Sequence, residues 1–234
     1  MSTNGLEPAQ HKAAKVVSFV YLIAMATSIF AEAYARGPLI VPGNAMQTAL
    51  NIVVSERLFR IGFAIHLLTF ASDAILAVAF YIVLRPVNRN IALLGAAWRL
   101  ADCAILAGNM VNDFVVLRLL SGADYLKAFN TSQLQALARL FISVEGAGFQ
   151  IGFIFLGLGS TIFSYLWLKS RYIPRAFAVW GIFASLVMAF VTLAIMVFPG
   201  MSIIGLTYMA PMFIYEVGLG LWLLIKGIRA PSVA

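Results

Sequence analysis

The chain has 234 residues, of which 62% are hydrophobic and 11% are charged, and its mean hydropathy is +0.96. Soluble globular domains carry about a quarter charged residues, so this composition excludes a soluble domain and indicates an integral membrane protein. The formal net charge is +7, but Lys and Arg cluster at the ends of apolar runs, where they anchor membrane helices. A nucleic-acid partner is therefore not expected.

The beginning of the chain predicts a cytoplasmic polar tail and a first membrane span. Residues 1–11 are polar and predict a disordered segment. Basic residues followed by an apolar run are also typical of a signal peptide. This run is long enough to cross a bilayer and five more spans follow, so we predict the first span at residues 15–34. Gly37-Pro38 and Pro42-Gly43 then break the helix, because Pro removes a backbone donor and Gly tolerates unusual dihedrals.

The remaining apolar runs predict five more spans, at residues 56–84, 90–117, 141–168, 176–198 and 202–225. The segment from Asn44 to Ser55 is expected to be either a short interfacial helix or a direct lead-in to the second span. Thr131 or Ser132 is expected to cap a helix that leads into the fourth span. The predicted fold class is all-α, with six transmembrane helices in one bundle over residues 12–229 and a tail of residues 230–234.

The basic residues predict which side of the membrane each turn faces. Lys and Arg are retained on the cytoplasmic side. Six lie on the side of the first, third and fifth connectors: Arg36, Arg57, Arg60, Arg118, Lys127 and Arg139. Nine lie on the other side, with the two tails: Lys12, Lys15, Arg85, Arg89, Lys169, Arg171, Arg175, Lys226 and Arg229. We therefore predict that both termini are cytoplasmic.

Ionisable residues inside the spans are the main functional signal. A charge at the bilayer centre costs from about 2.5 to more than 10 kcal/mol, so such residues normally face a protein interior and pair with one another. At about 100° per residue, each of the second and third spans has one polar face. These faces carry His66, Thr69, Ser72 and Asp73 on the second span, and Arg99, Asp102, Asn109, Asn112 and Asp113 on the third.

Depth along the helices predicts one contact in particular. With a rise of about 1.5 Å per residue, Asp73 and Arg99 each lie about 15 Å from the inner turn, near the midplane of the membrane. We predict a buried ion pair between them, with Asp102 as a second acceptor. Glu216 lies at a similar depth, and Pro211 is expected to kink its helix and free a backbone carbonyl. The outer half holds Glu32, His66, Asn109, Asn112, Asp113, Glu145 and Gln150, so we predict a polar funnel that is open to the outside.

Three functions are compatible with these residues. In the first, an outward-facing polar cavity binds or transports a small molecule or ion, with Asp73, Arg99, Asp102 and Glu216 at its core and His66 tuning protonation. The second is a membrane enzyme that acts on a lipid or apolar substrate, with His66 and an outer carboxylate such as Asp113 or Glu145 as acid and base. The third is a non-catalytic sensor or assembly protein whose polar residues only hold helices together.

Metal and cofactor ligands are scarce in the sequence. Only His66 and Cys103 lie in the membrane, with His11 in the tail, which is a poor supply for a metal site or a haem. No cofactor and no metal are therefore predicted. The expected partners are membrane lipid and a small-molecule ligand or ion, and the sequence does not determine the oligomeric state.

Several segments, spread from about Lys12 to Gly227, carry a family resemblance: Phe30-Ala31-Glu32, Ile40-Val41-Pro42-Gly43, Ser55 to Arg60, Leu84 to Asn90, Leu119 to Leu126, Tyr172-Ile173-Pro174-Arg175, Glu216, and Leu221 to Gly227. In these segments the chain resembles the bacterial membrane family known as domain of unknown function 4386. The resemblance implies a bacterial inner-membrane protein of about six helices, without a known activity. It also implies histidines near Glu145 and Gly159, and because this chain has neither, no cofactor or proton-relay role of such histidines is expected here.

Overall fold

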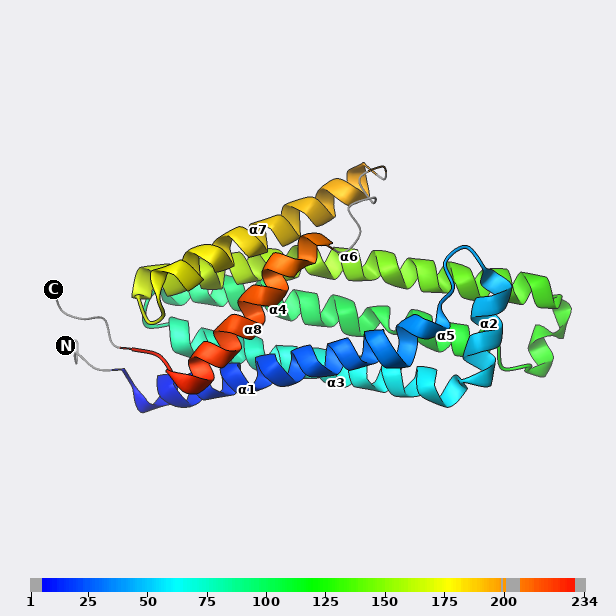
Figure 1. The fold of residues 1–234 in the computed structure, drawn as a ribbon, viewed down its shortest axis with the longest axis horizontal. Coiled ribbons are helices and arrows are strands. Elements are labelled where there is room, and N and C mark those ends of the chain that lie inside the picture. The colour runs from blue at the N-terminus through cyan, green and yellow to red at the C-terminus, as the bar shows by residue number, and fades with distance from the viewer. Residues whose placement is uncertain (1–5, 199, 201–206, 230–234) are drawn as a thin grey trace. The chain divides into compact units, whose positions relative to one another are not determined.

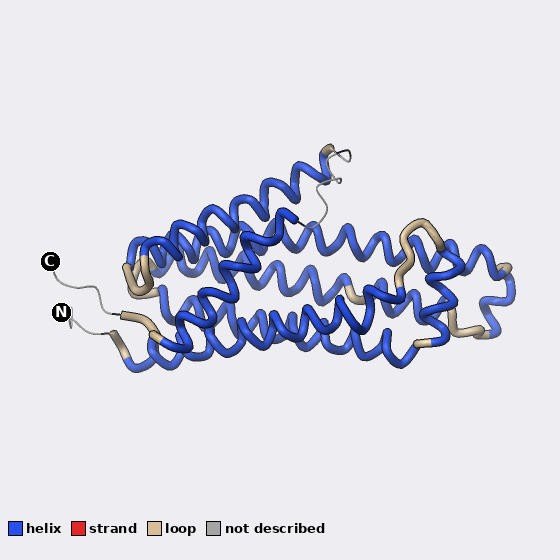
Figure 2. Tube along the Cα trace, viewed as in Figure 1, coloured by secondary structure: helices blue, strands red, loops and turns tan. Residues whose placement is uncertain are grey.

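The computed structural model describes residues 6–198, 200 and 207–229, and every regular element within these ranges is a helix (Figure 1; Figure 2). The all-α prediction is therefore confirmed. In the described part of the chain, six stretches are long and apolar enough to cross a membrane: Pro8–Leu39, Glu56–Leu84, Arg89–Leu119, Thr131–Ser170, Arg175–Val197 and Thr207–Ile225. The protein is a multi-pass membrane protein.

Eight α-helices and four short helical segments lie in the described residues. The α-helices are α1 (Pro8–Phe30), α2 (Ala45–Val54), α3 (Glu56–Leu84), α4 (Arg89–Asn109), α5 (Val111–Leu119), α6 (Thr131–Ser170), α7 (Arg175–Val197) and α8 (Ala210–Ile225). A π-helix (Ala31–Arg36) and a 3-10 helix (Gly37–Leu39) extend α1. Further 3-10 helices cover Asp124–Ala128 and Thr207–Met209.

The first helix starts earlier than the sequence predicts. Helix α1 begins at Pro8, so residues 8–11 are helical and not a disordered tail, while residues 1–5 lie outside the described ranges. Gln10 is buried, and its side-chain amide donates to the backbone oxygen of Val83 at 2.9 Å and to the Tyr172 hydroxyl at 3.3 Å. These hydrogen bonds satisfy a polar group that would otherwise be costly to bury.

The residue that caps the start of helix α6 is not one of the two that the sequence predicts. Asn130, and not Thr131 or Ser132, accepts a hydrogen bond from the backbone N–H of Gln133 at 2.9 Å. The Gln133 side chain in turn accepts from the Asn130 backbone N–H at 2.9 Å. This reciprocal pair is a capping box, in which two unsatisfied backbone donors at a helix start are paired.

The predicted kink at Pro211 is absent from α8 as described, because Pro211 lies in the first turn of that helix. At this position a missing backbone N–H costs no helical hydrogen bond. The Pro211 backbone oxygen accepts from the Trp180 indole N–H at 3.1 Å. The first part of the predicted sixth span, residues 202–206, lies outside the described ranges, and the helix ends at Ile225 as predicted.

The chain forms two compact units, which we describe separately. The first unit comprises residues 1–25, 72–103 and 150–234, and the second comprises residues 26–71 and 104–149. Helices α1, α3, α4 and α6 contribute to both units.

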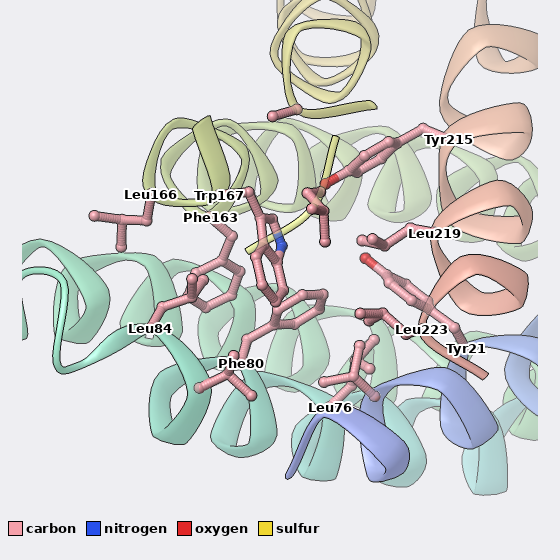
Figure 3. Packing of buried hydrophobic residues seen from close by; sticks show 14 of the residues in the cluster. Tyr21, Leu76, Phe80, Leu84, Phe163, Leu166, Trp167, Tyr215, Leu219 and Leu223 are labelled. Atoms are coloured by element: carbon pink, nitrogen blue, oxygen red, sulfur yellow. The ribbon is translucent and has the colours of Figure 1, made fainter. Parts of the chain in front are cut away.

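Aromatic side chains fill the core of the first unit (Figure 3). Trp167 of α6 is fully buried, and its ring meets Phe80 of α3 edge to face at 6.1 Å between centroids. Phe80 also stacks on Phe163 at 4.8 Å and meets Tyr21 of α1 edge to face at 5.6 Å. In a membrane, helices associate through such close packing because the surrounding lipid is as apolar as their own surfaces.

Gly181 lets α7 pack closely against two other helices, and we expect its substitution to destabilise the first unit. A Cβ atom at this position would lie 2.5 Å from the ring of Tyr215 and 2.6 Å from the Ser164 hydroxyl oxygen, which are themselves hydrogen-bonded at 3.0 Å. Gly181→Ala should therefore lower the free energy of unfolding by about 1–3 kcal/mol. Denaturation in detergent measures this loss of stability, and Gly146→Ala is the control.

A Cβ atom at Gly146 meets nothing within 4 Å. The control should leave stability unchanged or raise it by up to about 1 kcal/mol, because Ala favours the helix more than Gly does. An equal loss in both variants would show that the close approach at Gly181 is not the cause.

The second unit has two smaller apolar clusters. One contains Phe59 and Ile52 with Val116 and Ile142, and it joins helices α2, α3, α5 and α6. The other contains Phe70, Leu106 and Met110. These clusters hold in place the helical segments that carry the buried charges of Arg36, Asp113 and Glu145.

Candidate functional site

The first unit contains a buried group of charges around Arg99 of α4. The Arg99 side chain is 2% exposed. Its Nη2 lies 3.8 Å from Oδ1 of Asp73, and its Nη1 lies 3.5 Å from Oδ2 of Asp102. The predicted ion pair between Asp73 and Arg99 is therefore confirmed, and Asp102 is a second acidic neighbour of Arg99 but accepts no hydrogen bond from it.

Glu216 of α8 completes this group, which we call the Arg99 cluster (Asp73, Arg99, Asp102, Glu216 and Tyr21). Glu216 is buried and lies within electrostatic range of Arg99, Asp73 and Asp102. Tyr21 lies within interaction range of the Glu216 carboxyl group. Tyr21 was not predicted from the sequence, where it is one aromatic residue within an apolar run.

Gly159 of α6 makes room for the Arg99 side chain. A Cβ atom at Gly159 would lie 2.8 Å from Cγ and 3.2 Å from Cδ of Arg99. The apolar part of the arginine therefore rests on a bare stretch of helix backbone. The sequence suggested only that the glycines of this helix permit close helix contacts.

The Arg99 cluster has polar atoms without hydrogen bonds. Within the described chain, Nε and Nη1 of Arg99 and both carboxylate oxygens of Asp102 are buried and have no hydrogen-bond partner. Charge-assisted hydrogen bonds are usually about 2.7–2.9 Å long, so the two ion-pair distances are long. A buried polar group left unsatisfied costs about 1–3 kcal/mol. One guanidinium also faces three carboxyl groups, which leaves an excess of acidic groups.

The second unit contains a different group of buried charges, the Arg36 cluster (Arg36, Asp113 and Glu145). Nε and Nη2 of Arg36 donate to the two carboxylate oxygens of Asp113 at 3.1 and 3.0 Å. Nη2 also donates to Oε2 of Glu145 at 2.5 Å. Nη1 lies 3.8 Å from Oε2 of Glu32, which is largely exposed. Arg36, Asp113 and Glu145 are 4%, 0% and 2% exposed. This is the bidentate geometry that holds a buried arginine best.

Arg36 was not predicted as an intramembrane residue, because it precedes Gly37-Pro38, where the sequence predicts a helix break. In the structure the helix continues as a π-helix over Ala31–Arg36 and as a 3-10 helix over Gly37–Leu39. Arg36 therefore remains on a helical segment and is buried against Phe59, whose ring centroid lies 5.9 Å from Cζ of the guanidinium.

Two predicted polar residues support the Arg36 cluster through backbone contacts. The Asn109 amide donates to the backbone oxygen of Glu145 at 2.7 Å, and Asn112 donates to the backbone and side-chain oxygens of Asn109 at 2.9 Å. Gly148 is required beside them, because a Cβ atom there would collide with the Asn109 amide. These asparagines fix the positions of α4, α5 and α6 within the second unit.

His66 does not form the predicted acid and base pair. Its ring stacks on Phe70 and meets Phe149 edge to face, each with centroids 5.9 Å apart. No hydrogen bond or ion pair joins it to Asp113 or Glu145 in the described part of the chain, and its Nδ1 is buried without a hydrogen-bond partner. The structure therefore gives His66 an aromatic environment and no direct acidic partner.

The predicted polar residues separate into two groups. Asp73, Arg99, Asp102 and Glu216 belong to the first unit, whereas Glu32, His66, Asn109, Asn112, Asp113 and Glu145 belong to the second. Except for Glu32, Asp73 and Asn112, these residues are buried. The prediction that they form a single open funnel is not supported by this burial. Across residues 6–198, 200 and 207–229, no group of three His, Cys, Asp or Glu side chains is arranged to hold a metal ion.

No curated protein and no solved structure matches this chain. A family model described as a domain of unknown function (DUF4386) matches residues 16–227, which is nearly the whole chain. That range includes every residue of both clusters. The helical membrane architecture and this match over both groups of buried charges lead to one conclusion: the chain belongs to the DUF4386 family.

Proposed function

We propose that the protein binds a small molecule or ion at the Arg99 cluster and transports it across the membrane. The observation that carries this proposal is the contrast between the two clusters. Arg36 has direct hydrogen bonds to both of its buried acidic partners, and the described residues leave one buried oxygen of that cluster, Oε1 of Glu145, without a partner. In the Arg99 cluster four buried atoms of Arg99 and Asp102 have no hydrogen bond to any described residue. Helix packing alone gives no reason to keep such atoms unpaired, because each one costs stability.

The charge balance of the Arg99 cluster favours a positively charged ligand or protons. Three carboxyl groups surround one guanidinium, and an uncompensated charge is expensive inside a membrane. A protonated amine can donate to Asp102 while Arg99 retains Asp73. Protons on Asp102 or Glu216 would serve the same purpose, so transport coupled to protons is the mode that we propose.

The proposed location is the inner membrane of a bacterium, with both termini in the cytoplasm. Nine basic residues lie on the side of the termini against six on the other side. This asymmetry is the sequence feature that sets the orientation of helical membrane proteins.

Thermal unfolding of the detergent-purified protein tests the binding site. The probes are primary and quaternary amines, amino acids and small carboxylates, each added to the wild type, Asp102→Asn and Arg99→Met. A ligand at 100 times its Kd stabilises by about 2.7 kcal/mol, which raises the melting temperature measurably. We expect an amine to stabilise the wild type and to lose this effect in Asp102→Asn.

The exposed pair of Arg60 and Glu56 provides the matched control, because Arg60→Met removes a guanidinium that is half exposed. This variant should respond to the amine as the wild type does. The proposal is wrong if no probe stabilises the wild type and Asp102→Asn is less stable than the wild type. That result would assign the Arg99 cluster a structural role only, as in the third function considered from the sequence.

A further inference from the structure

An open apolar groove lies between α1, α3 and α4 of the first unit, with a volume of about 630 Å³. Small side chains explain why it exists, because Ala9, Ala13, Ala74 and Ala79 leave space that larger residues would fill. Val78 and Ile75 complete its walls and are about half exposed. The groove therefore opens toward the surroundings of the helices and presents them with a hydrocarbon surface.

Among the described residues that line this groove, Lys12 of α1 is the charged one. Two contacts show where along the helices Lys12 lies. Gln10 donates to the backbone oxygen of Val83, and Nη2 of Arg85 lies 3.9 Å from Oε2 of Glu7. The start of α1 is thus beside the end of α3, where the basic turn from Arg85 to Arg89 follows. Lys12 is at this basic end, and the apolar part of the groove continues along α3 to Ala74.

We propose that this groove binds one acyl chain of an anionic phospholipid, with the lipid phosphate at Lys12. The arrangement matches the chemistry of such a lipid, which has a negative headgroup at the membrane surface and hydrocarbon below it. The lining from Ala74 to Ile82 covers about 12 Å of helix, which is the length of several methylene groups. Basic residues at the ends of membrane helices attract anionic headgroups.

The charge at one end of the groove favours an anionic lipid over an apolar helix, because Lys12 lies at the basic end of an otherwise apolar lining. A lipid chain is narrower and adapts to an irregular surface. This proposal is independent of the Arg99 cluster, because none of the groove residues belongs to that cluster.

Native mass spectrometry of the detergent-purified full chain tests the proposal. The probes are palmitoyl-oleoyl phosphatidylglycerol and the corresponding phosphatidylcholine, offered as an equal mixture. We expect the wild type to retain phosphatidylglycerol about fivefold more, the size of the attraction between one Lys and an anionic headgroup. Lys12→Gln should reduce this ratio to about one, and Ala74→Trp should reduce the retention of both lipids by filling the groove.

Two control variants carry the same substitutions outside the groove. Lys15→Gln removes a neighbouring exposed charge, and Ala97→Trp adds the same ring to an exposed position on α4. Both should behave as the wild type does. The proposal is overturned if Lys12→Gln keeps the lipid preference, or if Lys15→Gln loses it equally. It is also overturned if Ala74→Trp abolishes a dimer and leaves lipid retention unchanged, because the occupant would then be a second copy. Lys12→Gln changes only an exposed side chain, so it decides the result even if Ala74→Trp does not fold.

Discussion

Replacing Arg36 with Met is expected to lower the free energy of unfolding by about 3–5 kcal/mol. The substitution leaves Asp113 and Glu145 buried without their shared guanidinium, which now donates three hydrogen bonds to them. Two uncompensated carboxylates in a buried site cost far more than the loss of one side chain's packing. Denaturation in detergent, followed by circular dichroism or by loss of monodispersity, measures the effect.

Two further variants separate the charge effect from the loss of packing. Arg60→Met removes an exposed guanidinium that pairs with Glu56, and an exposed pair contributes only about 0–1 kcal/mol. Combining Arg36→Met with Asp113→Asn and Glu145→Gln removes the buried charges together. This triple variant should recover much of the lost stability, because the cost of a buried pair comes mainly from the partner left behind. If Arg36→Met is as stable as Arg60→Met, the Arg36 cluster does not hold the second unit together.

Replacing Trp167 with Ala is expected to destabilise the first unit by about 3–5 kcal/mol. The indole is fully buried, and it contacts Phe80 and Tyr172 edge to face with centroids 6.1 and 6.4 Å apart. Its removal leaves a cavity at the centre of the aromatic core shown in Figure 3. Lost van der Waals contacts matter here because the lipid around the helices provides little hydrophobic driving force.

Trp167→Phe is the matched control for this cavity. The indole N–H is buried without a hydrogen-bond partner in the described residues, so Phe keeps an aromatic ring and removes an unsatisfied donor. We expect a loss of less than about 1.5 kcal/mol. Chemical denaturation of both variants measures the difference in stability. Equal losses of stability in the two would show that the cavity is not what destabilises Trp167→Ala.

Local sequence rules were sufficient where one residue type decides the outcome. The third helix of the chain, α3, runs from Glu56 to Leu84 as predicted, because charged residues bound its apolar run at both ends. The contact between Asp73 and Arg99 was predictable, because two helices joined by a short turn place residues at equal distance from that turn side by side. Local rules placed the cap of α6 one or two residues too late, and they placed a kink at Pro211, where the structure has a helix start.

The buried position of Arg36 required the tertiary structure. Its neighbours Gly37 and Pro38 favour a helix break, and the sequence therefore assigned it to an outer connector. The helix instead continues through a π-helical turn, since the direct contacts with Asp113 and Glu145 compensate for an unusual local conformation. Those acidic partners are 77 and 109 residues away in the chain, beyond the reach of any local pattern.

The sequence by itself determined that this is a helical membrane protein with charges inside its spans, because hydrophobic length and the cost of buried charge depend on residue type alone. Only the tertiary structure decided which charges meet. It divided the polar residues between two units and gave Arg36 direct hydrogen bonds to both partners, while it left Arg99 and Asp102 with unpaired atoms. Pairing depends on side-chain distances between helices, and periodicity and depth along a helix determine these only approximately.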